Sequence, residues 1–357
     1  MTILLSLDFP PDRGGIQRHL FDTVRFTYRA GDRVIAVVSA RADDGPERPL
    51  PCAVRRIAVP RLLNRKALTV PLLAALAAGA AAASRRVRFE CGNVYAACAA
   101  WAVTRIFRRP YAVYAYGTEL LGLQGTGWKA RLLRHVMRRA STVHALGEFT
   151  QRLVREAGIL AAVEIRPPRI ALADYPGTGL KLAPADGECR ILSVGRLVGH
   201  KGHRILVDAV SGLPEHILWR LVIIGSGPLE QALRRQAAAL GIAGRVDIVT
   251  GCGDDALREY YRAATVFVLP SLALPGGVEG FGIVILEAMA YGVPVIASDT
   301  GGVGEVLDGG TAGTLVPPGD SAALRAALAG HLADPDLRME RARRGYEHLR
   351  ANYVWNT

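Results

Sequence analysis

Residues 275–305 read PGGVEGFGIVILEAMAYGVPVIASDTGGVGE, which predicts a helix from about residue 283 to 291 and a buried strand, PVIAS, between two glycine-rich loops. A strand without polar alternation is buried on both faces, which is typical of parallel sheets covered by helices. Ligands of such sheets bind beyond the carboxyl ends of the strands. The stretch therefore predicts an α/β fold whose ligand site includes the loop before the helix.

Two carboxylates stand eight residues apart in this stretch, Glu279 in the first loop and Glu287 among apolar residues of the helix. Burying a carboxylate is costly unless its oxygens accept hydrogen bonds, and a pair of ligand hydroxyls would supply the donors. Taken alone, each glutamate is better explained without a shared task, Glu279 as a loop residue and Glu287 as a partly exposed helix residue. The glycine loops around the pair favour a shared binding site.

The motif E-x7-E, in the form EGFGIVILEAMAYGVPVIASDTGG, resembles the signature of the retaining, nucleotide-sugar-dependent glycosyltransferases of family 4, and the chain looks mannosyltransferase-like. The resemblance implies the GT-B architecture, in which two Rossmann-like β/α/β domains face each other across a cleft. It also implies that Glu279 contacts hydroxyls of the transferred sugar in the catalytic site and that Glu287 binds the nucleotide ribose. The adjoining donor-binding positions are Gly280, Phe281, Gly282 and Ile283.

A second candidate site for the donor lies in RILSVGRLVGHKGHRILVDAV, where Arg196 and Lys201 stand in a strand-to-helix loop. A guanidinium fork and an ammonium group in a glycine loop can hold a diphosphate, although basic residues in loops are often only solvated. The pattern G-R-x4-K-G resembles the diphosphate site of the same family. The next strand ends in a similar loop with Gly225 and Gly227, which is not the G-x-G-x-x-G of dehydrogenases.

The first strand, about residues 3–7, runs into FPPDRGGIQRHL, where Gly14 and Gly15 precede a helix. Adjacent glycines let backbone N–H groups approach an anion, and their position matches the amino-terminal donor-binding loop of the family. At AYGTEL the chain departs from the family pattern, because Tyr116 stands where a histidine is common. Tyrosine donates a hydrogen bond but is a poor base near neutral pH. The family resemblance offers His19 of the first loop as the alternative catalytic residue.

The rest of the 357-residue chain alternates strands and helices, which favours two domains. We expect a Rossmann-like acceptor-binding domain over residues 1–170, a linker rich in proline and glycine over 171–188, a Rossmann-like nucleotide-sugar domain over 189–335 and a helical segment over 336–357. In the family, an aromatic segment like ANYVWNT is usually followed by a closing helix. Here we expect that helix to be short or missing.

Positive charge is concentrated in the first half of the chain. Residues 1–180 contain 27 Lys and Arg against 13 Asp and Glu, and the remainder contains 17 against 19. Arg131, Arg134 and Arg138 lie on one side of an expected amphipathic helix. This asymmetry predicts a contact with something anionic, in addition to packing: an anionic membrane surface or a lipid-linked phosphate acceptor in preference to nucleic acid, which we do not expect as a partner.

Nothing in the sequence predicts a metal, a cofactor or a membrane span. The one D-x-D, at Asp334 and Asp336, is expected to cap a helix, and the Ala-rich segment 67–83 contains Pro71 and Gly79, which favour a packed helix. The five cysteines have no metal-like spacing and are expected to be reduced core residues of a cytoplasmic protein. Fixed cations rather than a metal would stabilise the leaving diphosphate.

Together these features predict a metal-independent enzyme that transfers a hexose from GDP-mannose or a UDP-sugar to a glycan or lipid-linked acceptor at the cytoplasmic face of the membrane. Two alternatives remain open. One is a nucleotide-sugar epimerase on the same fold, which the pairing of both donor motifs disfavours. The other is an inactive glycosyltransferase-like scaffold, which Tyr116 would allow.

Overall fold

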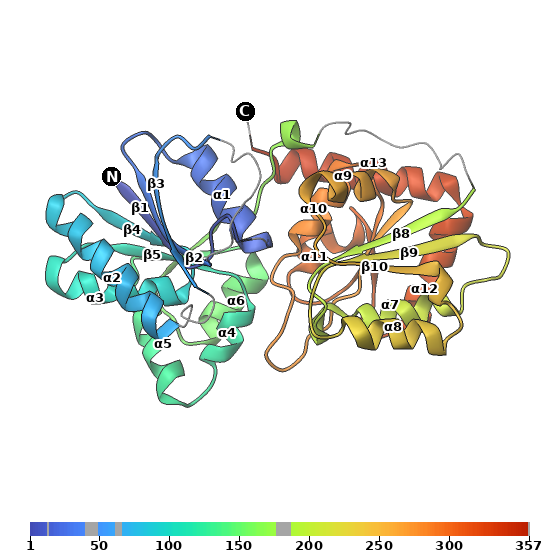
Figure 1. Cartoon of the computed structure of the whole chain (residues 1–357), viewed down its shortest axis with the longest axis horizontal. Coiled ribbons are helices and arrows are strands. Elements are labelled where there is room, and N and C mark those ends of the chain that lie inside the picture. Colours follow the sequence, from blue (N-terminus) through green and yellow to red (C-terminus); the bar gives the residue numbers. More distant parts are fainter. Residues whose placement is uncertain (13, 40–48, 61–65, 176–186, 356–357) are drawn as a thin grey trace. The chain divides into compact units, whose positions relative to one another are not determined.

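The structure, a computed structural model, describes residues 1–12, 14–39, 49–60, 66–175 and 187–355. The chain divides into two compact units, residues 1–168 and 169–357 (Figure 1). Each unit contains one parallel sheet with helices packed against it. The predicted α/β class with two Rossmann-like units is confirmed.

Unit 1 is built on a seven-stranded sheet in the order β3-β2-β1-β4-β5-β6-β7, and every neighbouring pair is parallel. The strands are β1 (Thr2–Ser6), β2 (Arg33–Ser39), β3 (Ala53–Val59), β4 (Arg88–Cys91), β5 (Tyr111–Ala115), β6 (Thr142–Ala145) and β7 (Ala162–Ile165). The helices are α1 (Gly15–Thr27), α2 (Lys66–Ala83), α3 (Val94–Phe107), α4 (Thr118–Leu123), α5 (Trp128–Arg138) and α6 (Glu148–Glu156).

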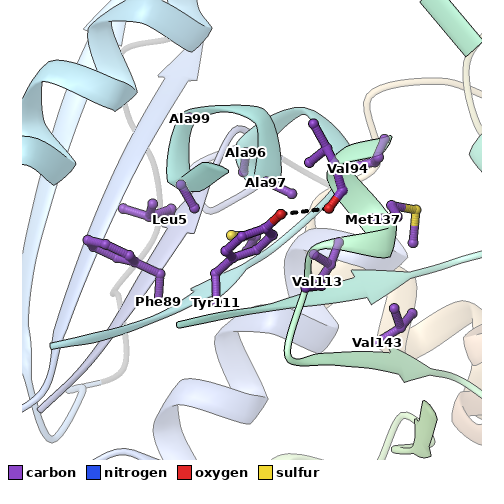
Figure 2. Packing of buried hydrophobic residues seen from close by; sticks show 14 of the residues in the cluster. Leu5, Phe89, Val94, Ala96, Ala97, Ala99, Tyr111, Val113, Met137 and Val143 are labelled. Carbon is purple, nitrogen blue, oxygen red and sulfur yellow. Dashed lines mark hydrogen bonds between the residues drawn. The ribbon is translucent and has the colours of Figure 1, made fainter. Parts of the chain in front are cut away.

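The core of unit 1 lies between one face of this sheet and the helices that cover it. Leu5, Phe89 and Val113 point to this face because alternate residues of a strand share a face. The phenol of Tyr111 is buried among them and donates a hydrogen bond of 2.6 Å to the carbonyl of Val136 in α5 (Figure 2). Without that bond, the buried hydroxyl would destabilise the core.

The Ala-rich segment forms α2 and packs against α3, as predicted. Leu73, Ala77 and Ala81 are fully buried in the core of unit 1. Among the helices in the described ranges, none combines the length and apolar character that crossing a bilayer requires.

Unit 2 contains a six-stranded parallel sheet in the order β10-β9-β8-β11-β12-β13. Figure 1 shows α7, α8 and α12 along one face of this sheet and α9, α10 and α13 along the other. The strands are β8 (Cys189–Val194), β9 (Trp219–Ile224), β10 (Val246–Val249), β11 (Val266–Leu269), β12 (Val295–Ser298) and β13 (Thr314–Val316). The helices are α7 (His203–Ser211), α8 (Glu230–Ala239), α9 (Asp254–Ala263), α10 (Ile283–Ala290), α11 (Val303–Val306), α12 (Ser321–Ala333) and α13 (Pro335–Asn352), with short 3-10 turns η1 (Leu172–Asp174), η2 (Gly199–Lys201), η3 (Ala243–Arg245) and η4 (Asp308–Gly310).

The segment that follows unit 1 differs from the expected linker. Ile170, Ala171 and Tyr175 are buried within unit 2, because this part of the segment is apolar and its glycines and prolines come later. The N–H of Ile170 donates to the carbonyl of Tyr353 at 2.9 Å. The first five residues assigned to the linker are therefore packed structure, and residues 176–186 lie outside the described ranges.

Two smaller predictions have different outcomes. The carboxylate of Asp334 accepts hydrogen bonds from the N–H groups of Asp336 and Leu337 at the start of α13, so the expected capping role is confirmed. The cysteines are free thiols, but only Cys91 and Cys189 are buried. The other three are partly exposed, so the expectation that all five belong to the core is wrong.

Candidate active site

In unit 2, four loops that follow β8, β9, β11 and β12 meet at the carboxyl edge of the sheet, where the sequence predicts the donor site. The N–H of Leu272 donates to the carbonyl of His200 at 2.7 Å, and the N–H of Leu197 donates to that of Ser226 at 3.0 Å. The N–H of Gly302 donates to the carbonyl of Glu279 at 3.0 Å. Backbone bonds thus join segments that lie far apart in sequence, and they bring the two predicted donor motifs together.

The predicted glycines permit this close approach. A Cβ atom at Gly225, whose φ is 159°, would lie 1.8 Å from the carbonyl oxygen of Gly195. A Cβ atom at Gly227 would lie 2.4 Å from the carbonyl oxygen of Leu197. Because no side chain fits these spaces, any larger residue at either position would push the β9 loop away from the loop that carries Arg196.

Lys201 and Glu279, predicted from separate motifs, form an ion pair. The Nζ of Lys201 contacts the Oε2 of Glu279, and the two side chains are only 14% and 11% exposed. The hydroxyl of Ser271 donates to the same carboxylate oxygen at 3.2 Å. Such a pair tolerates burial because each charge has a partner, whereas removal of one partner would leave the other uncompensated.

The guanidinium of Arg196 is exposed, and the described part of the chain offers it no side-chain partner. It follows β8 in the same loop as Lys201. The loop therefore holds one cation paired with a carboxylate and one that is available to an anion. That arrangement suits a diphosphate with a sugar attached.

Glu287 is 6% exposed, and its Oε2 atom accepts a hydrogen bond of 2.9 Å from the hydroxyl of Tyr261 in α9. Sequence reasoning expected a ligand to satisfy this buried carboxylate and missed the tyrosine. The two residues are 26 positions apart, and the pattern of α9 contains no signal that selects Tyr261 over its neighbour Tyr260.

The remaining donor positions surround the start of α10. Gly282 caps this helix with φ of 87°, and Ile283 is its first residue. The ring of Phe281 is buried and packs edge-on against Tyr353, with centroids 5.5 Å apart. Its side chain is therefore committed to packing within unit 2. The backbone of Gly280 to Ile283 leads into the helix N-terminus, where N–H groups favour an anion.

In unit 1, polar side chains gather where β1, β4 and β5 end. Asp8 follows β1, and its carboxylate accepts from the side-chain amides of Asn93 and of Gln17, the latter at 3.3 Å. The backbone N–H of Tyr116 donates to the carboxylate of Glu119 at 2.5 Å. Sequence reasoning missed Asp8 and Asn93, although polar residues at the ends of parallel strands are a usable signal.

His19 and Tyr116, the two alternatives for the catalytic residue, lie side by side, with ring centroids 6.1 Å apart and nearly perpendicular planes. Burial lowers the pKa of His19 to about 4 and raises the pKa of Tyr116 well above its usual value. Neutral imidazole and protonated phenol therefore prevail near neutral pH. The Nε2 of His19 and the hydroxyl of Tyr116 are buried without a hydrogen-bond partner in the described ranges.

The neighbouring carboxyls titrate above their ordinary range. Burial raises the pKa of Asp8, although the bond to Asn93 opposes the shift. Burial also raises the pKa of Glu119, against the effect of backbone N–H groups. Gly14, with φ of 153°, caps α1, and Gly15 is the first residue of that helix, which carries His19. This cluster of unit 1 can both donate and accept hydrogen bonds.

The three arginines assigned to a membrane or acceptor contact lie on α5, but two of them are occupied. Arg134 donates to the carbonyl of Gly125 at 2.7 Å, and Arg138 donates to that of Gly158 at 2.8 Å. Arg131 is exposed and has no side-chain partner in the described ranges. Trp128, 77% exposed on the same helix, and Ile106, 76% exposed at the end of α3, are apolar surface that sequence reasoning missed.

Nowhere in the described ranges do three or more His, Cys, Asp or Glu side chains gather so that they could hold a metal ion.

Comparison with known proteins gives one family and several full-length relatives. Residues 181–348 match the family model described as Glycosyl transferases group 1. The GDP-mannose-dependent alpha-(1-6)-phosphatidylinositol monomannoside mannosyltransferase of Mycolicibacterium smegmatis is 29% identical over 381 residues, which cover 99% of this chain and 95% of the relative.

Solved structures show the same fold over nearly the whole chain. Sucrose-phosphate synthase from Thermosynechococcus elongatus aligns with a TM-score of 0.80 at 23% identity, covering 99% of this chain and 95% of that one. The Anabaena protein HepE in complex with UDP-glucose aligns with a TM-score of 0.77 at 21% identity, covering 99% and 96%.

Proposed function

We propose that the chain, whose GT-B fold and glycosyltransferase relatives are described above, transfers a mannosyl group from GDP-mannose to a lipid-linked or glycan acceptor with retention of configuration. The choice of donor follows the full-length relative, which depends on GDP-mannose. The observation that carries the proposal is the buried contact between Lys201 and Glu279, in a site where Arg196 has no side-chain partner among the described residues. A sugar diphosphate requires a cation for its phosphates and, beside it, a carboxylate that accepts hydrogen bonds from the sugar hydroxyls.

In this proposal, Arg196, Lys201 and the N-terminus of α10 hold the diphosphate. The two cations and the helix dipole stabilise the charge that develops as the sugar leaves, so that neither a metal nor a cofactor is needed. Glu279 accepts hydrogen bonds from hydroxyls of the sugar, and Glu287 accepts them from the ribose.

The polar cluster of unit 1 binds the transferred sugar or the acceptor hydroxyl. Tyr116 and His19 each have a buried polar atom that a ligand hydroxyl can satisfy. The phenol of Tyr116 is protonated near neutral pH and cannot serve as the base. In keeping with the family resemblance, we propose that the β-phosphate of the donor accepts the proton of the attacking hydroxyl and that Tyr116 orients the sugar.

Measurements of nucleotide binding and transfer test the donor assignment. A bound nucleotide raises the unfolding temperature by mass action, so GDP and GDP-mannose should stabilise the protein more than UDP, ADP and their sugar conjugates. Transfer from GDP-mannose should persist after exhaustive chelation with EDTA. If only UDP-sugars stabilise the protein, the donor is a UDP-sugar and not GDP-mannose. Strict dependence of transfer on added Mg²⁺ or Mn²⁺ would overturn the cation-based mechanism.

The same assay addresses the epimerase and scaffold alternatives. An epimerase would convert the nucleotide sugar without any acceptor, whereas a transferase releases GDP only as sugar is transferred or hydrolysed. A scaffold would bind the donor and release nothing. No described feature favours either alternative.

We also propose that unit 1 contacts the cytoplasmic membrane surface through α5 and the end of α3. Trp128 and Ile106 offer apolar area, while Arg131 offers an exposed cation. Interfacial binding of this kind combines apolar insertion with attraction to anionic lipid. The full-length relative acts on a phosphatidylinositol mannoside, which is a membrane lipid.

Vesicle sedimentation tests this contact. The protein should bind vesicles of anionic phosphatidylglycerol at low salt and dissociate as salt rises, because screening removes about 1 kcal/mol per basic residue near the surface. Trp128→Ser with Arg131→Glu should abolish binding. Arg235→Glu, an exposed arginine of α8 in unit 2, is the matched control. Equal binding to neutral vesicles would contradict the electrostatic part of the proposal.

A further inference from the structure

We propose that Tyr261 is a positioning residue for the donor: its hydroxyl holds the carboxylate of Glu287 in the orientation that accepts the ribose hydroxyls. The proposal rests on the proposed function, in which Glu287 binds the ribose. It assigns Tyr261 to the site through its contact with Glu287 and does not require the tyrosine to touch the ligand.

The contact is direct and buried. The Tyr261 hydroxyl lies 2.9 Å from the Oε2 of Glu287, and both side chains are largely removed from solvent. A glutamate side chain has three rotatable bonds, and in the interior each orientation must find donors for its oxygens. A hydrogen bond from a fixed phenol selects one orientation. A carboxylate has about four lone-pair sites, so it can accept bonds from several donors at once, ligand hydroxyls included.

The phenol is itself held in place by neighbouring rings. Tyr261 stacks on Tyr291, with centroids 5.7 Å apart and planes 13° from parallel, and Phe267 lies 5.8 Å away. Tyr175 packs against Tyr291 at 5.6 Å in an edge-to-face arrangement. Offset and edge-to-face packing of this kind is favourable beyond simple burial. The ring of Tyr261 therefore cannot turn away without disrupting the core of unit 2.

The ring cluster draws on distant parts of unit 2. Tyr261 lies on α9, Tyr291 is the C-cap of α10, and Tyr175 follows η1 in the segment after unit 1. Glu287 lies on α10, one turn before Tyr291. One packed cluster therefore fixes both the residue that would bind the ribose and its hydrogen-bond donor.

The expected consequence is that the site prefers a nucleotide whose ribose carries both hydroxyls over one that lacks them. If the bond prearranges Glu287 for two hydroxyls, its loss should weaken binding of a ribonucleotide and leave a nucleotide without these hydroxyls unaffected. A merely structural role for Tyr261 would weaken both ligands alike. The ratio of the two dissociation constants therefore separates positioning from stability.

The experiment measures calorimetric binding of GDP and of 2′,3′-dideoxy-GDP to the full chain. Tyr261→Phe keeps the stacked ring and removes only the hydroxyl. We expect it to lower the preference for GDP over the dideoxy nucleotide by about three- to tenfold, the loss typical of one hydrogen bond. Glu287→Ala should abolish the preference, and Tyr261→Phe in the Glu287→Ala background should change nothing further. Any unfolded fraction cancels, because the ratio compares two ligands on one sample.

Tyr260→Phe provides the control, because this neighbouring tyrosine of α9 is only half-buried and makes no contact with Glu287 among the interactions of the described ranges. It should leave the ratio unchanged. The positioning role is overturned if Tyr261→Phe retains the full preference while Glu287→Ala loses it, or if it weakens both nucleotides equally. If the unmodified protein binds both nucleotides equally, the ribose assignment of Glu287 fails and the inference fails with it.

Discussion

The candidate sites of the two units differ in how their key buried polar groups are satisfied. In unit 2, the buried carboxylates are paired within the protein: Lys201 contacts Glu279, and Tyr261 donates to Glu287. The exposed Arg196 is the exception, because the described ranges offer it no side-chain partner. In unit 1, the Nε2 of His19 and the hydroxyl of Tyr116 are buried with no partner in the described ranges. The carboxylates of the donor site are prearranged, whereas the unit 1 cluster retains two polar atoms that find no partner within the described ranges and that a ligand can satisfy.

This difference follows the chemistry assigned to each unit. A diphosphate brings concentrated charge, and cations that are fixed in advance need no reorganisation when it binds. A sugar or acceptor brings neutral hydroxyls, which bind best to donors and acceptors that have no other partner. Three changes, taken from the largest expected effect to the smallest, would test this distinction.

Lys201→Ala should cause the largest loss, because it removes a charge-assisted contact with the donor and leaves Glu279 buried without a cation. We expect kcat/KM for transfer to fall by about two orders of magnitude, about 3 kcal/mol, with nucleotide affinity contributing most of the loss. Arg204→Ala, an exposed cation on α7, is the control. A value of kcat/KM within twofold of the unmodified protein would remove Lys201 from the donor site.

His19→Gln should make the protein less sensitive to acid. Burial lowers the pKa of His19 to about 4, so between pH 6.5 and pH 4 the unfolded state binds a proton that the folded state does not. This histidine therefore contributes a loss of stability as pH falls through that window, on the order of 2 kcal/mol. The substitution should remove that part of the loss, measured by urea unfolding at pH 7 and pH 4.5.

Comparing His19→Gln with the unmodified protein separates the effect of His19 on acid stability from the effects of the neighbouring carboxyls. Asp8 and Glu119 have raised pKa values and act in the opposite direction, because their folded forms bind protons first as pH falls. They are present in both proteins. His216→Gln, at an exposed position of unit 2, should leave the pH dependence unchanged. An identical dependence for His19→Gln would show that the imidazole is not buried in its neutral form.

Tyr116→Phe should have the smallest effect, because the phosphate rather than the phenol accepts the proton. Loss of one hydrogen bond to the sugar should lower kcat about tenfold, or about 1.4 kcal/mol, and leave nucleotide affinity unchanged. Complete loss of transfer with intact donor binding would instead make the hydroxyl chemically essential. If the unmodified protein transfers to no acceptor while Tyr116→His does, the scaffold alternative would be supported.

Much of the fold could be predicted from the sequence because its signals are local. Apolar runs such as Val295–Ser298 predict buried strands, and glycines after strands predict the loops that bear Arg196 and Glu279. Because carboxyl ends of parallel strands share one edge, those loops were expected to meet, and the structure brings them together.

Contacts between side chains distant in sequence were decided only by the tertiary structure. Lys201 and Glu279 are 78 residues apart, and Asp8 and Asn93 are 85 apart. Whether such side chains make contact depends on the order of the strands in the sheet and on the direction of each side chain. The hydrophobic pattern of the sequence encodes neither of these. The same limit explains why Tyr261 was missed and why the hydrogen bonds of Arg134 and Arg138 to backbone carbonyls were not foreseen.

The sequence by itself determined the α/β class, the two-unit organisation and the residue types at the edge of each sheet, because hydrophobic period and turn chemistry act over a few neighbouring residues. Only the tertiary structure decided which of those residues are paired within the protein and which remain available to a ligand. The physical reason is that a buried polar group must find a partner, and packing of distant segments decides whether that partner is protein or ligand.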